Sequence, residues 1–303
     1  MMVVLAHCPT SLAPPAMPPT AARRLKRAFA LDTARLAVGC LHAELALYPK
    51  PGLVSLLDNG SHRDMTAATF LRSLFALRHY FMLICQAGID DAPFAVLKRL
   101  GIDAERRMLL ATGGVNTHRG AIFSLGLLCA ALGRAHALRT DGSASALRAV
   151  LLATWGADLA GHTQAAAGYS HGLRAAALHA AGGAREEGAL GLPSVFEIGL
   201  PALRHTLGAG RDLRHARIDA LFALMAHIGD TNVLHRGGRA GAYTVKLRAR
   251  RFLASGGTAD PDWQAAALAC HRLFVRRRLS PGGAADLLAA TCLVHAAVAR
   301  AAA

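Results

Sequence analysis

The period of the apolar residues most constrains the fold of this chain. Apolar side chains recur at intervals of three and four, as at Phe70, Leu74 and Leu77, which is the spacing of one face of an α-helix. No segment sustains the alternation of apolar and polar residues that a half-buried strand needs. Aromatic residues, which strands favour, make up only 5% of a chain that is 53% hydrophobic. We therefore predict an all-α fold.

The helices are separated by glycine-rich and proline-containing turns rather than by a linker. The first helix should begin near Leu25 and end at Pro49, because proline cannot continue a helix. Asp64 is the expected N-cap of the second helix. Further helices are expected at about 102–110, 119–133, 143–161, 165–181, 193–207, 213–228, 239–254, 260–278 and 282–301. We predict one compact multi-helix domain over 23–303, with a disordered proline-rich tail at 1–22.

The chain carries a formal net charge of +15, from 34 Lys and Arg against 19 Asp and Glu. The densest basic runs, at 23–27, 248–251 and 276–278, lie in helical contexts and lack the interleaved aromatic residues on which nucleic-acid bases stack. We interpret them mainly as solvated helix faces. A basic helical protein that binds nucleic acid remains an alternative, and a polyanionic small substrate is another explanation of the charge.

The cysteines and the N-terminal residues indicate a cytoplasmic protein. Six cysteines occur with no CxxC spacing, and most lie in apolar helical stretches, as is typical of small buried side chains in a reducing compartment. The first residues lack the basic segment of a signal peptide. The longest apolar run, at 121–133, is too short to span a bilayer.

Polar residues gather at the predicted helix ends. The segment 48–64 combines a Pro-Gly turn beside Lys50 with Ser61, His62 and Asp64. A single helix needs only one cap, so the additional carboxylate and imidazole groups are candidates for a site. Carboxylate oxygens of this kind suit Mg²⁺, which binds one or two of them and takes its other ligands from water and phosphate.

The segment 112–120 reads TGGVNTHRG and precedes the helix expected at 119–133. Gly113 and Gly114 allow the backbone N–H groups to approach an anion, and the N-terminus of the next helix favours phosphate. His118 and Arg119 add side-chain donors. The spacing alone fits a plain turn equally well.

Three later segments complete the pattern. Gly182–Gly188 contains Arg185, which could bind a phosphate with two N–H groups, although a charged turn after a helix explains it equally well. Asp230 follows an apolar helix, where an acid opposes the helix dipole and suggests a cation ligand. In 280–286, Ser280 is expected to cap a helix that has Pro281 at its first position.

Five groups of motifs occur in one order along the chain: KPGLVS with DNGSHRDM, GIDAERRM with ATGGVNTHRGAIFSLG, GAREE with GLP, DTNVLHR, and SPGGAADLL. This set resembles the triphosphoribosyl-dephospho-CoA synthase family over roughly residues 25–300. The resemblance implies an α-helical, Mg²⁺-dependent enzyme. It would transfer the 5-triphosphoribosyl group of ATP to the 2′-hydroxyl of 3′-dephospho-CoA, releasing adenine.

That reaction suggests roles for the polar residues. Asp64, Glu105 and Asp230 are the candidate Mg²⁺ ligands or stabilisers of a cationic transition state. Glu187 and His118 are the candidate base and acid, and Glu105 could exchange roles with Glu187. The candidate substrate-binding residues are Lys50, Ser61, His62, Gly113, Gly114, Asn116, Thr117, Arg119, Arg185, Asn232 and Arg236.

The resemblance also implies a place in a pathway. The product would pass to a phosphoribosyl-dephospho-CoA transferase that acts on an acyl carrier protein of malonate decarboxylase or citrate lyase, and composition weakly favours the former. No nucleic acid or membrane partner is expected, and a homodimer stays open. A Mg²⁺-dependent N-glycosyl hydrolase of ADP-ribose-like substrates is the nearest alternative, because it needs the same acids with water as the nucleophile.

Overall fold

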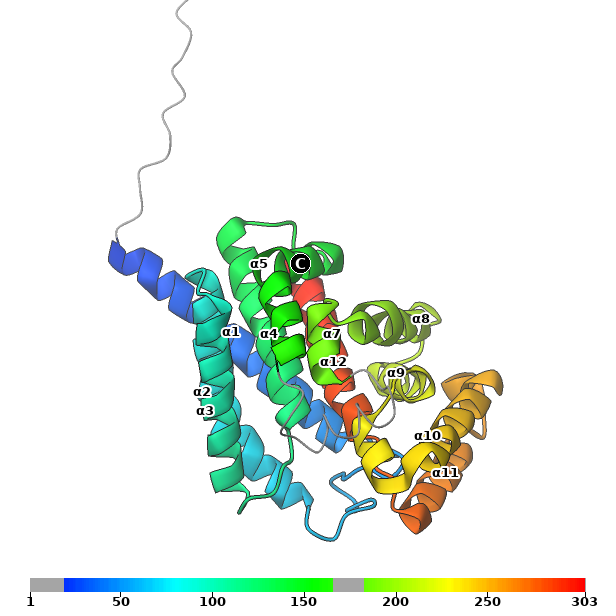
Figure 1. The fold of residues 1–303 in the computed structure, drawn as a ribbon. Helices are drawn as coiled ribbons and strands as arrows, with labels where there is room; N and C mark the ends of the chain where they lie inside the picture. Colours follow the sequence, from blue (N-terminus) through cyan, green and yellow to red (C-terminus); the bar gives the residue numbers. More distant parts are fainter. Residues whose placement is uncertain (1–18, 166–182, 303) are drawn as a thin grey trace, which may run out of the picture.

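The computed structural model describes residues 19–165 and 183–302, and these residues contain eleven α-helices and no strand. Figure 1 shows α1 running behind the helices that follow it, while α10 and α11 lie side by side at the far edge of the molecule. The all-α prediction is confirmed. The helices are α1 (Pro19–Ala46), α2 (Ala67–Ile89), α3 (Phe94–Ala111), α4 (Arg119–Leu138), α5 (Ala144–Ala165), α7 (Ala184–Ala189), α8 (Leu200–Gly208), α9 (Leu213–His227), α10 (Thr231–Ala254), α11 (Trp263–Arg277) and α12 (Gly282–Ala301), with a π-helix η1 (Ser194–Gly199) and a 3₁₀-helix η2 (Gly257–Ala259).

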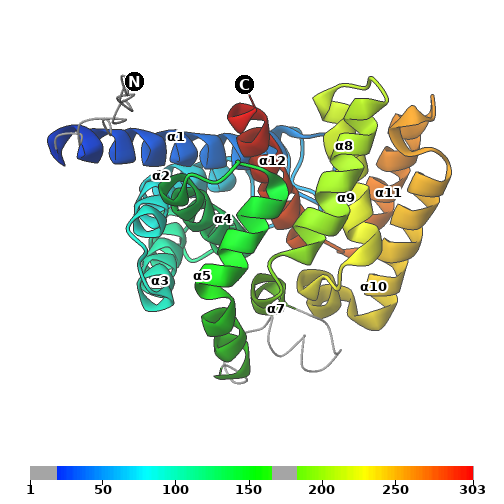
Figure 2. The same cartoon turned by 90° about the horizontal axis from the view of Figure 1, so that it is seen from above.

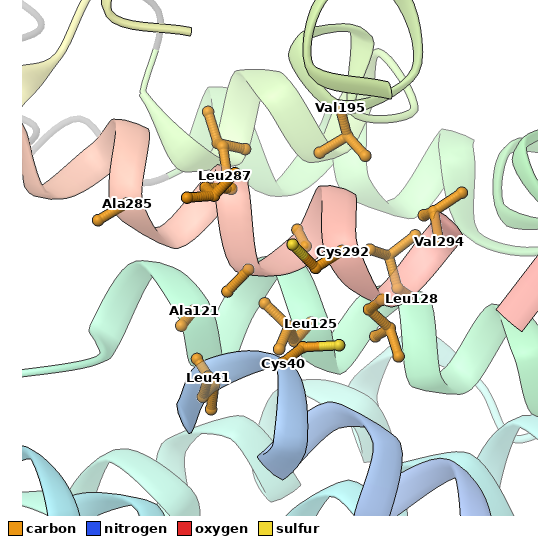
Figure 3. Close-up of a cluster of buried hydrophobic side chains, with 14 of the residues drawn as sticks. Cys40, Leu41, Ala121, Leu125, Leu128, Val195, Ala285, Leu287, Cys292 and Val294 are labelled. Carbon is orange, nitrogen blue, oxygen red and sulfur yellow. The ribbon is translucent and has the colours of Figure 1, made fainter. Parts of the chain in front are cut away.

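The core is one continuous cluster of buried side chains around α4 and α12. Both helices are rich in Ala, Gly and Leu, so backbones pack closely. Figure 3 shows Cys40 of α1, Leu125 of α4 and Cys292 of α12 meeting in this cluster. Seen from above, α12 lies between the layer of α2–α5 and the layer of α8–α11 (Figure 2).

By length and composition alone, α4 and α12 also pass as membrane spans. More than half of the most apolar window of each helix is buried inside the molecule. The core packing therefore already accounts for their apolar character.

Several helix ends differ from the sequence-based expectations. Thr66, not Asp64, is the N-cap of α2: its hydroxyl accepts the Thr69 N–H at 3.3 Å, and Thr69 reciprocates. Ser280 does not cap α12, whose N-cap is Pro281. The start of α1 at Pro19 falls inside the expected tail; the rest of that tail and nearly all of the helix expected at 165–181 lie outside the described residues.

The prediction that Asp230 follows the end of a helix and does not begin one was wrong. The carboxylate does not end the preceding helix; it is the N-cap of α10, which begins at Thr231 rather than near residue 239. The glycine pair in this helix obscured its start, and Gly238 has non-helical angles (φ 57°, ψ −161°) that put a kink there. Such angles are essentially restricted to glycine.

Candidate active site

The N-terminal ends of α4, α10 and α12 meet, and carboxylates from one helix close the start of another. Asp230 Oδ1 accepts the N–H groups of Asn232 at 2.9 Å and Val233 at 3.3 Å, in its own helix α10. Its Oδ2 accepts the N–H of Ala284 in α12 at 3.1 Å. The side chain is 8% exposed. Asp230 therefore ties the first turns of two helices together.

Asp286 makes the corresponding connection from α12 to α4. It lies in the second turn of α12 and accepts the backbone N–H of Ala121, in the first turn of α4. Its carboxylate rests on Gly120, where an added Cβ would be 2.1 Å from Asp286 Oδ2. Unlike Asp230, Asp286 is only partly buried.

A buried ion pair lies beside these helix ends. Lys50 follows α1 and donates to Glu44 at 2.5 Å, and both side chains are almost fully buried. Burial raises the pKa of Glu44 and lowers that of Lys50, and the attraction between them opposes both shifts. Breaking such a pair leaves one buried charge uncompensated, so it anchors the loop after α1 to the site.

Asp286 has the most perturbed carboxyl group of this region. Burial is the largest cause that raises its pKa well above the usual range, and the negative charges of Glu44 and Asp230 raise it further. The Ala121 N–H opposes these effects. Burial also raises the pKa of Asp230, but the backbone N–H groups of Ala284, Val233, Asn232 and Gly283 all act to lower it. The two aspartates thus differ mainly in how many donors they have.

His62 holds the loop 48–64 against α10 and against the connection between α11 and α12. Arg236 donates to His62 Nδ1 at 2.9 Å, and His62 Nε2 lies 2.8 Å from Ser280 Oγ. Because arginine has only donors, Nδ1 must accept and Nε2–H must donate to Ser280. Burial and the charge of Arg236 lower the pKa of His62 to about 4, so the ring is neutral at neutral pH. Ser61 Oγ donates to the Leu279 carbonyl at 2.6 Å and closes the same contact.

His118 lies at the start of α4 and is 2% exposed. Its Nδ1 is 2.6 Å from Ser73 Oγ, and its buried Nε2 has no hydrogen-bond partner among the described residues. Burial, and secondarily the charge of Lys50, lower its pKa to about 3. His118 is therefore a neutral imidazole at neutral pH, a form that suits a base better than a cationic acid.

The glycine-rich loop between α3 and α4 is open to solvent. Gly113 and Gly114 have φ values of 67° and 89°, and an added Cβ on either would meet no atom within 4 Å. Asn116 Oδ1 accepts the N–H of Arg119 at 3.2 Å, and the Arg119 side chain forms an ion pair with Glu105. The loop thus has free space above it for a ligand to approach the backbone.

The remaining predicted residues lie at different distances from this junction. Glu187, in α7, accepts the Ser194 hydroxyl at 2.5 Å and the Ser194 N–H at 3.2 Å, so it supports the start of η1. Burial raises its pKa, and the Ser194 hydrogen bonds oppose the shift. Arg185 lies on α7, Asn232 is exposed in the first turn of α10, and the Thr117 hydroxyl is enclosed without a hydrogen-bond partner among the described residues.

The three acids expected to bind Mg²⁺ are not gathered. Asp64 is exposed beside His62 at 3.7 Å, Glu105 is paired with Arg119, and Asp230 caps two helices. The described residues contain no group of three or more His, Cys, Asp or Glu side chains that could hold a metal ion. The arrangement does not fit a magnesium site built from these three carboxylates, and their roles as ligands stay predictions.

Sequence reasoning missed Glu44 and Asp286, and it treated Ser280 as a cap only. Glu44 lies three residues after Leu41 and seven after Ala37 in α1, which puts it on the same buried face of the helix. A glutamate at a core position was the available signal. Asp286 belongs to the SPGGAADLL motif, but nothing in the local sequence distinguished it from an ordinary acidic residue near the start of a helix.

A hollow of about 510 Å³ lies elsewhere in the described residues. It is lined by Asp91, Arg134 and residues of α5 at the C-terminal half of α4. Arg134 is 14 residues beyond Gly120, about 20 Å along the helix, and it is paired with Asp91 at 2.8 Å. The hollow brings together no group of catalytic residues, so we place the site at the helix N-termini.

The described residues define an all-helical protein whose carboxylates and helix N-termini converge on one junction. The family model described as ATP:dephospho-CoA triphosphoribosyl transferase matches residues 30–302, so the chain belongs to this family. A 2-(5″-triphosphoribosyl)-3′-dephosphocoenzyme-A synthase of Klebsiella pneumoniae is 40% identical over 264 residues, covering 85% of this chain and 91% of that protein. A probable synthase of Acinetobacter calcoaceticus is 39% identical over 256 residues, covering 84% and 87%. No solved structure matches the chain.

Proposed function

We propose that the protein transfers the 5-triphosphoribosyl group of ATP to the 2′-hydroxyl of 3′-dephospho-CoA and releases adenine. The family match carries this proposal, because it spans residues 30–302 and therefore every helix end at the junction. The two synthases described above are 39% and 40% identical to this chain and cover 84% and 85% of it.

The reaction makes three demands on the site. The bond between C1″ of the ribose and N9 of adenine breaks as a bond from C1″ to the 2′-oxygen forms, through a transition state with positive charge on the ribose, as in glycoside hydrolysis. Negative charge nearby stabilises that state. The hydroxyl group must lose a proton, and adenine leaves more readily when it gains one.

The N-terminal side of α4 is the part of the junction that suits the triphosphate. The backbone of Gly113 and Gly114 is exposed there, and Arg119 and Arg236 are exposed cationic side chains at the rim. Lys50 is enclosed in its pair with Glu44, so it would act on the substrate at a distance through its charge. Arg185, Asn116, Thr117, Asn232, Ser61 and His62 remain proposed substrate-binding residues.

The base is proposed to be one of three groups. Glu105 is partly exposed and near Arg119, Glu187 is committed to Ser194, and His118 has a free nitrogen in a buried position. Single-turnover adenine release by Glu105→Gln, Glu187→Gln and His118→Phe distinguishes them. Loss of the base should slow the step by about 10²–10⁴-fold, whereas a residue that supports local structure should change stability more than rate.

Magnesium is proposed to arrive with ATP. A triphosphate supplies most of the oxygen ligands that Mg²⁺ takes, and the protein then needs to contribute one carboxylate or none. Adenine release should therefore depend on the concentration of the Mg–ATP complex. Tight binding of free Mg²⁺ to the protein without ATP, measured by calorimetry, would contradict this view.

Incubation of the purified protein with ATP, Mg²⁺ and 3′-dephospho-CoA tests the function. We expect adenine and the condensed product, both dependent on dephospho-CoA. Adenine and ribosyl triphosphate without dephospho-CoA would instead indicate an N-glycosyl hydrolase. No turnover combined with salt-sensitive binding to DNA or RNA would indicate the nucleic-acid-binding alternative.

The enzyme is further proposed to act in the cytoplasm and to supply malonate decarboxylase rather than citrate lyase. It would pass its product to a phosphoribosyl-dephospho-CoA transferase that acts on an acyl carrier protein, and it would need no nucleic acid or membrane. Transfer of the product to a purified acyl carrier protein by that transferase, in a coupled assay, tests the pathway.

A further inference from the structure

Asp230 and Asp286 lie at the same junction but have different sets of hydrogen-bond donors. The two oxygens of Asp230 accept backbone N–H groups from both α10 and α12. Among the described residues, Asp286 accepts one backbone N–H, that of Ala121. An ionised carboxylate has about four sites for donors, so Asp230 is close to satisfied whereas Asp286 has unused capacity.

The charges around Asp286 are mostly negative. Glu44 at the end of α1 and Asp230 at the start of α10 both act on it. Two cations of the described residues lie near this junction and both are engaged: Lys50 pairs with Glu44, and Arg119 pairs with Glu105. His118, at the start of α4, is neutral at neutral pH. Within residues 19–165 and 183–302, Asp286 forms no ion pair within 4 Å.

An enclosed carboxyl group with two acidic neighbours and one donor retains its proton more readily than an ordinary aspartate. The direction of its pKa shift agrees with this. Asp286 also keeps accessible surface, whereas Glu44 and Asp230 are buried. Of the three acids, it is the one that a substrate at the junction can reach.

We propose that Asp286 is the catalytic acid that protonates the departing adenine. This inference rests on the proposed function. As the C1″–N9 bond breaks, its electron pair passes to the adenine ring, and the Asp286 hydroxyl gives its proton to a ring nitrogen. The 2′-hydroxyl of dephospho-CoA forms the new C1″–O bond and loses its proton to the base. Asp286 regains a proton from solvent, to which it keeps partial access.

The test compares two leaving groups in Asp286→Asn. Asparagine keeps the shape and an acceptor for the Ala121 N–H, but it has no acidic proton. With ATP, we expect single-turnover adenine release to fall by about 10²–10⁴-fold. In an ATP analogue methylated at N7, the adenine ring leaves as a neutral molecule and needs no proton. On this analogue the variant should therefore retain most of the rate that the wild type has on the same analogue.

A structural role would give a different result, because misfolding slows both substrates. Equal loss of rate on ATP and on the N7-methylated analogue would therefore overturn the proposal. Asp230→Asn is the matched control: it should lower the melting temperature and slow both substrates alike. If Asp286→Asn does not fold, Gly120→Ala is the second variant. It leaves the Asp286 carboxyl group in the protein but displaces it, because the new Cβ would be 2.1 Å from Asp286 Oδ2. We again expect the rate to fall on ATP and not on the N7-methylated analogue.

The wild type separates this inference from the proposed function. Failure of the wild type to release adenine in the presence of dephospho-CoA defeats the function and the inference together. Normal wild-type transfer, combined with a leaving-group-independent effect in Asp286→Asn, defeats only the role of Asp286.

Discussion

Two aspartates in different parts of the molecule, Asp219 and Asp286, differ in their hydrogen-bond partners, and the difference separates a structural role from a chemical one. Asp219, in α9, binds the α8–α9 connection and η2: its Oδ2 accepts from Thr206 at 2.8 Å, Thr258 Oγ1 at 2.7 Å and Arg211 at 3.2 Å, and its Oδ1 accepts the Thr258 N–H at 2.8 Å. Among the described residues, Asp286 accepts only the Ala121 N–H, and its charged neighbours Glu44 and Asp230 are acidic. Both carboxyls lie against a glycine.

The difference lies in whether the fold has supplied partners. A buried polar group normally finds its hydrogen bonds within the protein, and Asp219 does so completely, with a guanidinium to balance its charge. Asp286 meets only one donor among the described residues, so it keeps acceptor sites unfilled where a substrate can enter. A group of that kind reduces stability but is available for chemistry.

The largest effect on stability is expected at Asp219. Asp219→Ala removes four hydrogen bonds and leaves the Arg211 guanidinium without its carboxylate. The free energy of unfolding should fall by about 3–5 kcal/mol, as measured by urea denaturation. The rate of adenine release by the folded protein should stay at the wild-type value; a large loss of rate would remove the distinction between the two sites.

A matched pair of glycine substitutions sharpens the comparison. A Cβ at Gly257 would lie 2.6 Å from Asp219 Oδ1, and one at Gly120 would lie 2.1 Å from Asp286 Oδ2. Gly257 also has a φ of 58°, so Gly257→Ala should lower the free energy of unfolding by about 1–3 kcal/mol and leave the rate unchanged. Gly120→Ala should mainly slow adenine release. The two variants are compared by melting temperature and single-turnover rate, and the opposite pattern would contradict the assignment.

The smallest expected effect is the pH dependence of stability. The pKa of Asp286 is raised in the folded protein, so above the ordinary aspartate value of about 4 the native state holds a proton that the unfolded state has lost. The contribution of this group is fully present below that pH and is lost as pH rises through the raised pKa, by at most about 1.4 kcal/mol per pH unit. Asp286→Asn has no titrating group at this position, so its stability lacks this decrease with rising pH.

The difference in free energy of unfolding between Asp286→Asn and the wild type should therefore grow in favour of the variant as pH rises above about 4. Urea titrations at several pH values measure it. A difference that is constant with pH would mean that the carboxyl titrates equally in the folded and unfolded states.

The sequence predicted the helices well but not how their ends meet. Periodicity predicts α4 and α12 because their cores repeat every three to four residues, and it placed the start of each correctly. Asp230 was misread because local sequence does not say whether an acid ends one helix or begins the next, and the Gly237–Gly238 pair concealed the start of α10.

The partners of the site residues depended on contacts that the sequence does not contain. The Glu44–Lys50 pair joins residues that are only six apart in the sequence. Asp286, by contrast, lies more than 150 residues from the backbone of α4 to which it is hydrogen-bonded, and no local pattern indicates that contact. The polar loops were recognisable as a group, whereas their division into anchors and reactive groups required the helix junction. Of the quoted motifs, the TGGVNTHRG loop stays a proposed phosphate-binding segment with open space above Gly113 and Gly114.

The most direct test measures unfolding free energy and single-turnover adenine release for Asp286→Asn and Asp219→Asn under the same conditions. The first variant should be at least as stable as the wild type and release adenine about 10²–10⁴-fold more slowly. The second should be less stable and release adenine at the wild-type rate. Normal release by Asp286→Asn, or a loss of rate that follows the loss of stability in both variants, would contradict the account.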